Sequence, residues 1–321
     1  MGTPMSANID RVIAHPLTSA AMGVVKWSPI KSLWWTTMCT AWVIGGSLYF
    51  SWQAVGVFIL TSAVTLCGGH SLGMHRKFIH DSFTCPKWLE ILGVWLGTLV
   101  GLGGPYTMMY THDIRDWAQR QSACHPFLSH QSKMLKDFWW QIHCKLYFQH
   151  PPKFIYPKKL TQSFGLNFIQ KTSMLQQLPL GLLLFLSGGW GFVFWGICGR
   201  VTISIFGHWL IGYFAHNHGP RHWHINGAAV QGFNVPFCGL ITFGECWHNN
   251  HHAFPNSARI GLYKNQIDPG WWVLKFLEKT GLVSNLSLPE NLPFREDLLP
   301  VFPQPHTRPT NTPATSSVNQ P

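Results

Sequence analysis

The chain has 321 residues, of which only 11% are charged, and Lys and Arg outnumber Asp and Glu to give a net charge of +11. Soluble domains usually carry about 25% charged residues, so this composition argues against an ordinary soluble globular protein. The basic residues flank apolar segments instead of forming a separate patch, which argues against a nucleic-acid partner.

The first long apolar region predicts two membrane spans. Residues 32–75 contain no Asp, Glu, Lys or Arg, and one crossing needs only about 20 apolar residues. After a polar lead-in over residues 1–30, we therefore expect spans over 32–50 and 54–69, joined by the polar segment 51–53. Basic residues lie beyond both ends of this pair, which predicts that both ends are cytoplasmic.

A second uncharged region, residues 172–199, predicts another pair of spans that continues to Ile211 and turns at 187–189. Basic residues again lie before and after the pair, so both of its ends are also expected in the cytoplasm. A single extra crossing between the two pairs would place the ends of the second pair on the opposite side of the membrane from those of the first. We therefore expect the apolar segment 88–104 to lie in the membrane interface instead of crossing.

These elements predict an all-α integral membrane protein. Its four transmembrane helices form two hairpins, with one interfacial helix and a cytoplasmic cap that holds the His-rich segments. The membrane domain is expected over residues 31–285. Residues 286–321 are rich in Pro, Thr, Ser and Asn, a composition that predicts a disordered tail.

Histidine is the most informative residue type, with 18 copies, and neutral imidazole is the commonest metal ligand in proteins. The densest cluster is "GECWHNNHHAFP", residues 244–255. On a helix, His248, His251 and His252 occupy positions i, i+3 and i+4 and share one face. His251 and His252 diverge slightly, so the triplet could serve two adjacent metals. The alternative is a solvated polar turn that holds three histidines.

A second cluster, "CGGHSLGMHRKFIH", places His70, His75 and His80 five residues apart. Five residues rotate an α-helix by about 140° beyond a full turn, so neither successive pair shares a face of a straight helix. Either pair could meet a metal only where the helix bends or ends. The spacing alone does not decide which pair works together.

The chain resembles the membrane-bound fatty acid desaturases, in particular their Δ9 branch of bacterial and stearoyl-CoA type. The similarity extends from about residue 30 to residue 285. It is carried by "LGMHRKFIHDSFTCPKWLE", by "HWLIGYFAHNHG" and by "GECWHNNHHAFPNSARIG". That family has an H-x4-H box, two H-x2-H-H boxes and one further His that bind two irons, which activate O2 and remove two hydrogens from a fatty acyl chain.

The resemblance implies a set of metal ligands and one supporting residue. In the segment 67–80 it selects His75 and His80 as the pair and leaves His70 as a neighbour of the site. Glu245, beside the third box, is the candidate for orienting a ligand ring. The implied ligands are His75, His80, His112, His216, His248, His251 and His252.

The second box departs from the family pattern, because the sequence there is "HDIRD", residues 112–116. Only His112 remains, and Arg115 and Asp116 occupy the other two ligand positions. Arg115 has no free lone pair for a metal, whereas Asp116 lies one turn after His112 and carboxylates do bind non-haem iron.

A second departure lies four residues before His216, where the family has an Asn and this chain has Gly212. His208, one turn earlier, is a tentative replacement ligand. His125 is a second tentative ligand that could compensate for the altered box. The alternatives are an ordinary buried histidine for His208 and a loop histidine for His125.

Three functions remain open at this stage. The favoured one is an oxidoreductase that introduces a double bond into a fatty acyl chain at a His-bound di-iron centre. The others are a hydroxylase or related lipid oxidase on the same site, and a catalytically inactive lipid-binding membrane protein. The acyl group would be carried by a lipid, by coenzyme A or by an acyl carrier. No HPGG haem-binding motif occurs, so electrons are expected from a separate ferredoxin or cytochrome b5-like donor, with the site on the cytoplasmic face of a bacterial inner membrane.

Overall fold

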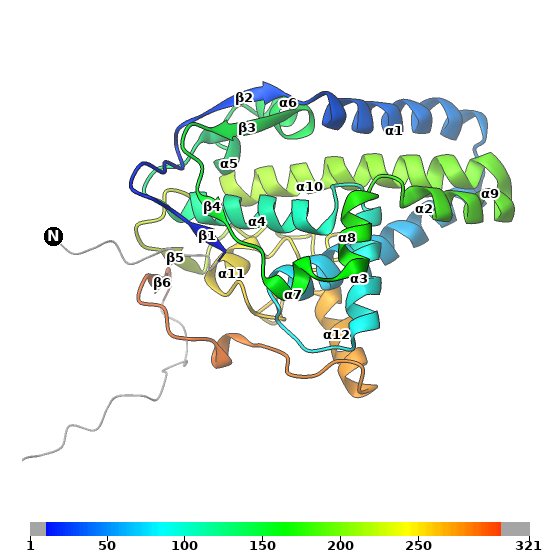
Figure 1. The fold of residues 1–321 in the computed structure, drawn as a ribbon. Coiled ribbons are helices and arrows are strands. Elements are labelled where there is room, and N and C mark those ends of the chain that lie inside the picture. The colour runs from blue at the N-terminus through cyan, green and yellow to red at the C-terminus, as the bar shows by residue number, and fades with distance from the viewer. Residues whose placement is uncertain (1–10, 303–321) are drawn as a thin grey trace, which may run out of the picture.

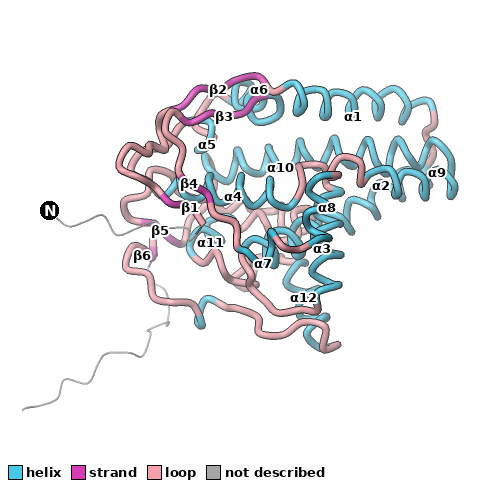
Figure 2. The backbone as a smooth tube through the Cα atoms, viewed as in Figure 1, coloured by secondary structure: helices cyan, strands magenta, loops and turns pink. Residues whose placement is uncertain are grey.

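The computed structural model describes residues 11–302, and helices predominate in that part of the chain (Figures 1 and 2). The helices are α1 (Pro29–Leu48), α2 (Trp52–Ala63), η1 (Val64–Ile79), α3 (Lys87–Leu99), α4 (Pro105–Arg120), α5 (Pro126–Ser129), α6 (Met134–His143), α7 (Lys158–Thr161), α8 (Phe164–Lys171), α9 (Gln177–Val193), η2 (Phe194–Gly199), α10 (Arg200–Asn217), α11 (His248–Ala253), α12 (Pro269–Lys279) and η3 (Pro289–Asn291). The strands are β1 (Val12–Ile13), β2 (Gly23–Trp27), β3 (Cys144–Phe148), β4 (Lys153–Phe154), β5 (Trp223–Ile225) and β6 (Leu298–Pro300).

Two helical segments within residues 11–302 are long and apolar enough to cross a membrane. They are Trp52–Ile79, which joins α2 to η1, and Gln177–Asn217, which joins α9 to α10 through η2. In Figure 1, α1, α2, α9 and α10 extend together to one end of the molecule, and the short helices and strands gather at the other end. The structure therefore separates an apolar helical region from an irregular one.

The Gln177–Asn217 segment reverses direction at Gly188 and Gly189. Both glycines have non-helical backbone angles, and Gly189 has a φ of +69°, which a residue with a side chain rarely adopts. A Cβ at Gly196 would lie 2.7 Å from the Cδ1 atom of Leu184. Two positions twelve residues apart cannot touch in a straight helix, so the two arms lie side by side, and the break falls inside the predicted turn at 187–189.

Close packing fixes η1 against α3. A Cβ atom at Gly93 would lie 2.8 Å from the Cα of Gly73, and one at Gly97 would lie 2.9 Å from the carbonyl oxygen of Gly69. Side chains at these positions would force the two backbones apart. The glycines therefore set the position of η1, the helix that carries His70 and His75 and ends just before His80.

The irregular end contains three two-stranded antiparallel sheets, so the expectation of an all-α protein is wrong in detail. β1 pairs with β4, β2 with β3, and β5 with β6. Residues 11–28, expected in the lead-in, supply two of these strands, and residues 286–302, expected in a disordered tail, supply β6. Short edge strands carry too few residues to show a clear alternating pattern in the sequence. Residues 1–10 and 303–321 lie outside the described part of the chain.

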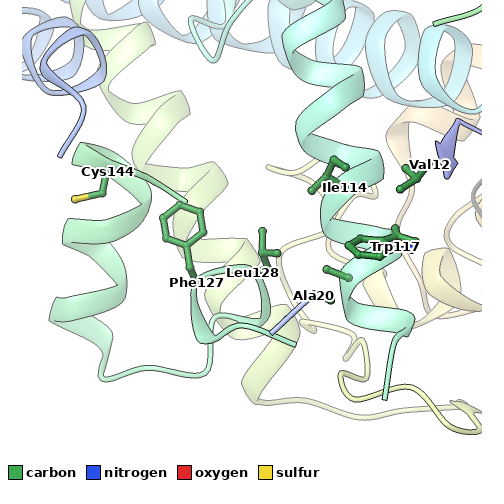
Figure 3. Close-up of a cluster of buried hydrophobic side chains, with 8 residues drawn as sticks. Val12, Ala20, Ile114, Trp117, Phe127, Leu128 and Cys144 are labelled. Atoms are coloured by element: carbon green, nitrogen blue, oxygen red, sulfur yellow. The ribbon is translucent and has the colours of Figure 1, made fainter. Parts of the chain in front are cut away.

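Helix α4 is held by an apolar cluster on the face away from the histidines. Ile114, Trp117 and Ala118 of α4 are buried with residues of β1, of α5 and of the β3 start. Figure 3 shows several of these side chains around α4, with Phe127 and Leu128 approaching from α5. This packing leaves the stripe of α4 that begins at His112 turned toward the interior.

Candidate metal centre

The seven histidines implied by the family resemblance come together in two groups. The possible ligand atoms in each group lie within 4.8 Å of one another. Group one is His75, His80, His112 and His251, and group two is His216, His248 and His252.

Group one depends on an unusual helix. Residues 64–79 form a π-helix, in which the amide of one residue bonds to the carbonyl five residues earlier. The His80 amide donates to the carbonyl of His75 at 3.1 Å in this pattern, and their ring centroids lie 4.9 Å apart. The pair converges where the helix ends, as expected, because η1 ends at Ile79 and His80 follows it directly; the π-helical hydrogen bond from His80 to His75 adds to this.

The other two members of group one come from α4 and α11. The Nε2 atoms of His80 and His112 are 3.3 Å apart, and the ring of His251 lies 4.5 Å from that of His75. All four rings therefore face a common point at which three separate chain segments meet.

Group two consists of His216 at the end of α10 and of His248 and His252 on α11. The Nε2 atom of His248 lies 3.1 Å from that of His216 and 2.9 Å from that of His252. His251 follows His248 by three residues and turns to group one, while His252 follows by four and stays in group two. The triplet on α11 thus contributes to both groups, as its spacing predicted.

Polar contacts behind the rings set their orientation. The Nδ1 atom of His75 lies 2.7 Å from Glu245 Oε2, and Ser71 donates a hydrogen bond of 2.5 Å to Glu245 Oε1. The Nδ1 atom of His112 lies 3.2 Å from Asp113 Oδ1, and Asp113 is paired with Arg11. A proton on each Nδ1 leaves Nε2 as a lone pair that faces the group. Glu245 therefore lies against His75, and its role in supporting a metal ligand stays a prediction.

Burial keeps most of these imidazoles neutral. It lowers the pKa of His80, His248, His251 and His252 well below the usual value. His112 differs: burial would lower its pKa, but the Asp116 and Asp113 carboxylates outweigh burial and raise it. A histidine binds a metal in its neutral form, so these neutral rings can bind a cation without first losing a proton.

The carboxylate of Glu245 is held ionised. Burial would raise its pKa, but His75, Arg76 and Ser71 outweigh burial and lower it far below the usual range. An ionised Glu245 keeps the proton of His75 on Nδ1 and so directs the other ring nitrogen toward group one.

The donor set fits a pair of metal cations. The Nε2 atom of His251 is buried and has no hydrogen-bond partner within the described residues. Buried polar atoms are almost always satisfied, so an unpartnered nitrogen facing three other imidazoles is best explained by a ligand that the protein binds. Imidazole suits iron as well as zinc and copper.

Three tentative ligands lie outside both groups. Asp116 is buried one turn after His112, and its charge acts on both His112 and His248. His208 lies beside His70, with ring centroids 5.2 Å apart. His125 begins α5, where its Nδ1 accepts a hydrogen bond of 3.1 Å from the Phe127 amide.

Arg115 binds polar partners other than the grouped histidines, although one of them, His130, stacks on His216 with ring centroids 5.3 Å apart. It donates to Nε2 of His130 and, at 2.9 Å, to Oε1 of Gln141. The Nδ1 atom of His130 lies 2.8 Å from Asp137. Sequence reasoning missed His130 and also Gln119, whose side chain contacts His216. Gln119 could have been found by its spacing, seven residues after His112 on the same helix face.

Comparison with known proteins identifies the family. Residues 50–263 match the family model described as "Fatty acid desaturase". The chain is 37% identical over 243 residues to the sn-1 stearoyl-lipid 9-desaturase of Anabaena variabilis, covering 74% of this chain and 86% of the relative. It is 36% identical to the protein of the same name from Synechocystis sp., covering 75% of this chain and 74% of the relative. It is 31% identical to the sn-2 palmitoyl-lipid 9-desaturase of Nostoc sp., covering 74% of this chain and 83% of the relative.

The family match covers most of the chain and includes all seven grouped histidines. Its members are oxidoreductases of lipid metabolism, and the two long apolar helical segments are consistent with a membrane protein. The chain belongs to the fatty acid desaturase family and is an oxidoreductase of that family.

Proposed function

We propose that this protein introduces a double bond into a fatty acyl chain in an O2-dependent reaction at two irons held by the seven grouped histidines. The observation that carries the proposal is the meeting of those histidines, from four separate helices, in two adjacent groups. Group one would hold one iron through four imidazoles, and group two the other through three. The family match and the names of the relatives support the reaction.

A bound iron pair supplies the O2 activation that is needed to break an unactivated C–H bond, which side-chain acids and bases cannot break. The protein's own residues prepare the site. Neutral imidazoles bring no negative charge to it, and Glu245 and Asp113 fix the rings of His75 and His112. Four of the seven histidines are buried and three are partly buried, which limits the access of bulk water. The negative charge of Asp116 acts on His112 of group one and on His248 of group two.

We also propose the membrane arrangement. α1, the segment Trp52–Ile79 and the two arms of Gln177–Asn217 would provide four crossings, and α3 would lie at the interface. The charge pattern supports placing both ends of each pair, and the histidine groups, on the cytoplasmic side. A bacterial inner membrane is the proposed location, where the acyl substrate already resides.

The proposed substrate is an acyl chain esterified in a membrane lipid. The three relatives described above, at 31–37% identity, are named as lipid-linked acyl desaturases, which supports this carrier; two relatives at 29% identity are named as acyl-CoA desaturases. Electrons would come from a separate ferredoxin or cytochrome b5-like protein.

Expression in an iron-replete host with a competent electron donor tests this function. We expect about two irons in each purified chain and new double bonds in the extracted lipids. New hydroxyl groups without double bonds would instead show a lipid hydroxylase. A chain that holds no iron and leaves every lipid class unchanged would contradict an enzymatic role.

A further inference from the structure

Group two contains a fourth polar atom that the histidine pattern does not include. The Oε1 atom of Gln119 lies 3.2 Å from Nε2 of His216. Gln119 has an exposed fraction of 0%, and His216 of 4%. The contact is therefore screened from water, and each of its polar atoms needs a hydrogen-bond partner or a bound ligand.

The orientation of the Gln119 amide is set by its other end. Its Nε2 donates a hydrogen bond of 2.8 Å to the carbonyl of Leu128. Exchanging the amide nitrogen and oxygen would bring two acceptor oxygens together at that distance. The amide oxygen, which has only lone pairs to offer, therefore faces His216.

The tautomer of His216 makes this contact unfavourable without a cation. Its Nδ1 lies 2.7 Å from the carbonyl of Gly212, an acceptor that requires a proton on Nδ1. The neutral ring then has a lone pair on Nε2, and that lone pair faces the oxygen of Gln119 and the Nε2 of His248. Moving the proton to Nε2 would only transfer the same conflict to Gly212.

A doubly protonated His216 would relieve both contacts but would bury a positive charge. Within the described residues its polar contacts are Gly212, Gln119 and His248, none of which carries a negative charge. A buried unpaired cation is costly. A metal ion between His216, His248 and Gln119 would accept the lone pairs of all three side chains and remove the repulsion between them.

Two other positions near group two, Gly212 and His130, offer no free donor. Gly212 has no side chain, and the space that a Cβ would enter is occupied by Nε2 of His130 at 3.2 Å. Both ring nitrogens of His130 are bonded, one to Asp137 and the other to Arg115. Gln119 thus points at group two with an unused acceptor and lies against His216. Asp116, on the same helix face, acts on His248 by its charge and, within residues 11–302, has no hydrogen bond to a group-two ring.

The geometry points to Gln119 as the fourth protein ligand of the metal in group two, through its amide oxygen; this inference rests on the proposed function. His112, Asp116 and Gln119 are spaced i, i+4 and i+7 and lie on one face of α4. His112 belongs to group one, and Gln119 contacts His216 of group two. This stripe takes the place of the altered second box and gives each metal four neutral protein donors.

The test compares Gln119→Leu with Gln119→Glu. Both variants lose the amide that donates to Leu128, but only Gln119→Glu keeps an oxygen that can bind the metal. Gln121→Leu is the matched control, because Gln121 lies at the end of the same helix and donates to the Trp117 carbonyl at 2.9 Å. Each protein is purified in full length, freed of metal and titrated with Co²⁺, and binding is followed by visible absorption and by metal content.

We expect the wild-type protein and Gln121→Leu to bind two Co²⁺ ions. In Gln119→Leu one ion should bind at least about tenfold more weakly with an altered absorption spectrum, and Gln119→Glu should restore it. The variants His80→Ala and His252→Ala identify which binding event belongs to which group.

Two results would overturn the assignment while leaving the proposed function intact. One is a Gln119→Leu protein that binds both ions with wild-type affinity and spectrum. The other is a Gln119→Glu protein that loses the ion as completely as Gln119→Leu, which would show that the Leu128 hydrogen bond is what matters. A wild-type chain that binds no Co²⁺ and contains no iron when isolated would instead remove the proposed function, and this inference with it.

Discussion

The rings of His75 and His80 meet across a single π-helical turn. The His80 amide donates to the His75 carbonyl at 3.1 Å, and the ring centroids are 4.9 Å apart. In an α-helix the same two side chains would point in different directions. The first histidine pair therefore depends on the helix type over residues 64–79 as much as on its spacing in the sequence.

The contact between η1 and α3 offers a test of that dependence. A methyl group at Gly73 would collide with the Gly93 backbone, whereas one at Gly68 would make an ordinary contact of 3.7 Å with Leu96. We expect Gly73→Ala to lower the free energy of unfolding by about 1–3 kcal/mol and to reduce metal content. Thermal unfolding and metal analysis check this, with Gly68→Ala as the control. Equal behaviour of the two variants would contradict the close packing described.

Glu245 is expected to tune group one through His75. Gln in its place removes the negative charge that holds the proton on Nδ1, so metal affinity at one of two sites should fall by about 10–100-fold. Titration of the metal-free protein measures this. Glu278→Gln is the control, since Glu278 pairs with Lys275 on the surface. An unchanged affinity in Glu245→Gln would show that the carboxylate does not act on the metal site.

His125 and His208 are expected to be dispensable for metal binding. One begins α5 and the other contacts His70, and neither belongs to a group. The variants His125→Ala and His208→Ala should each retain about two metals per chain, although His125→Ala loses a helix cap worth about 0.5–2 kcal/mol. Loss of one metal in either variant, by elemental analysis of folded protein, would restore that residue as a ligand.

The metal-free protein should lose stability on acidification. Unfolded histidines titrate near pH 6.5, whereas burial lowers the pKa of His80, His248, His251 and His252 in the fold. Below about pH 6.5 the unfolded chain therefore binds protons that the folded chain does not, and stability falls as pH falls.

Thermal unfolding of the metal-free protein in detergent, from about pH 8 to about pH 5, measures this slope. His248→Ala/His252→Ala should show a shallower dependence, because two of the buried imidazoles are gone. A midpoint that stays level or rises toward low pH in the wild-type protein would contradict the burial of neutral rings.

The sequence predicted which histidines lie close together better than it predicted the folding of the chain around them, and their role as metal ligands stays a prediction. The spacing of His248, His251 and His252 sufficed to indicate two adjacent sites, because an α-helix places those positions on one face. The pairing of His75 with His80 needed the family resemblance, since a π-helix has no recognisable sequence pattern.

Other parts could not be derived from local patterns. The spacing places Gln119 on the same face of α4 as His112, but the direction of its amide oxygen could not be derived from the sequence, because the distant Leu128 carbonyl sets it. The strands at 12–13 and 298–300 are too short to show a periodicity, and their partners lie far away in the chain. Long apolar segments were visible because composition alone identifies them.

Metal content of paired histidine variants tests the central claim most directly. Protein from iron-replete cells is measured as wild type, His251→Ala and His252→Ala, which differ by adjacent residues of one helix assigned to different groups. We expect about two irons in the wild type and about one in each variant, with loss of the remaining iron when both are changed. Unchanged iron in the variants, or none in the wild type, would contradict a two-metal centre built from these histidines.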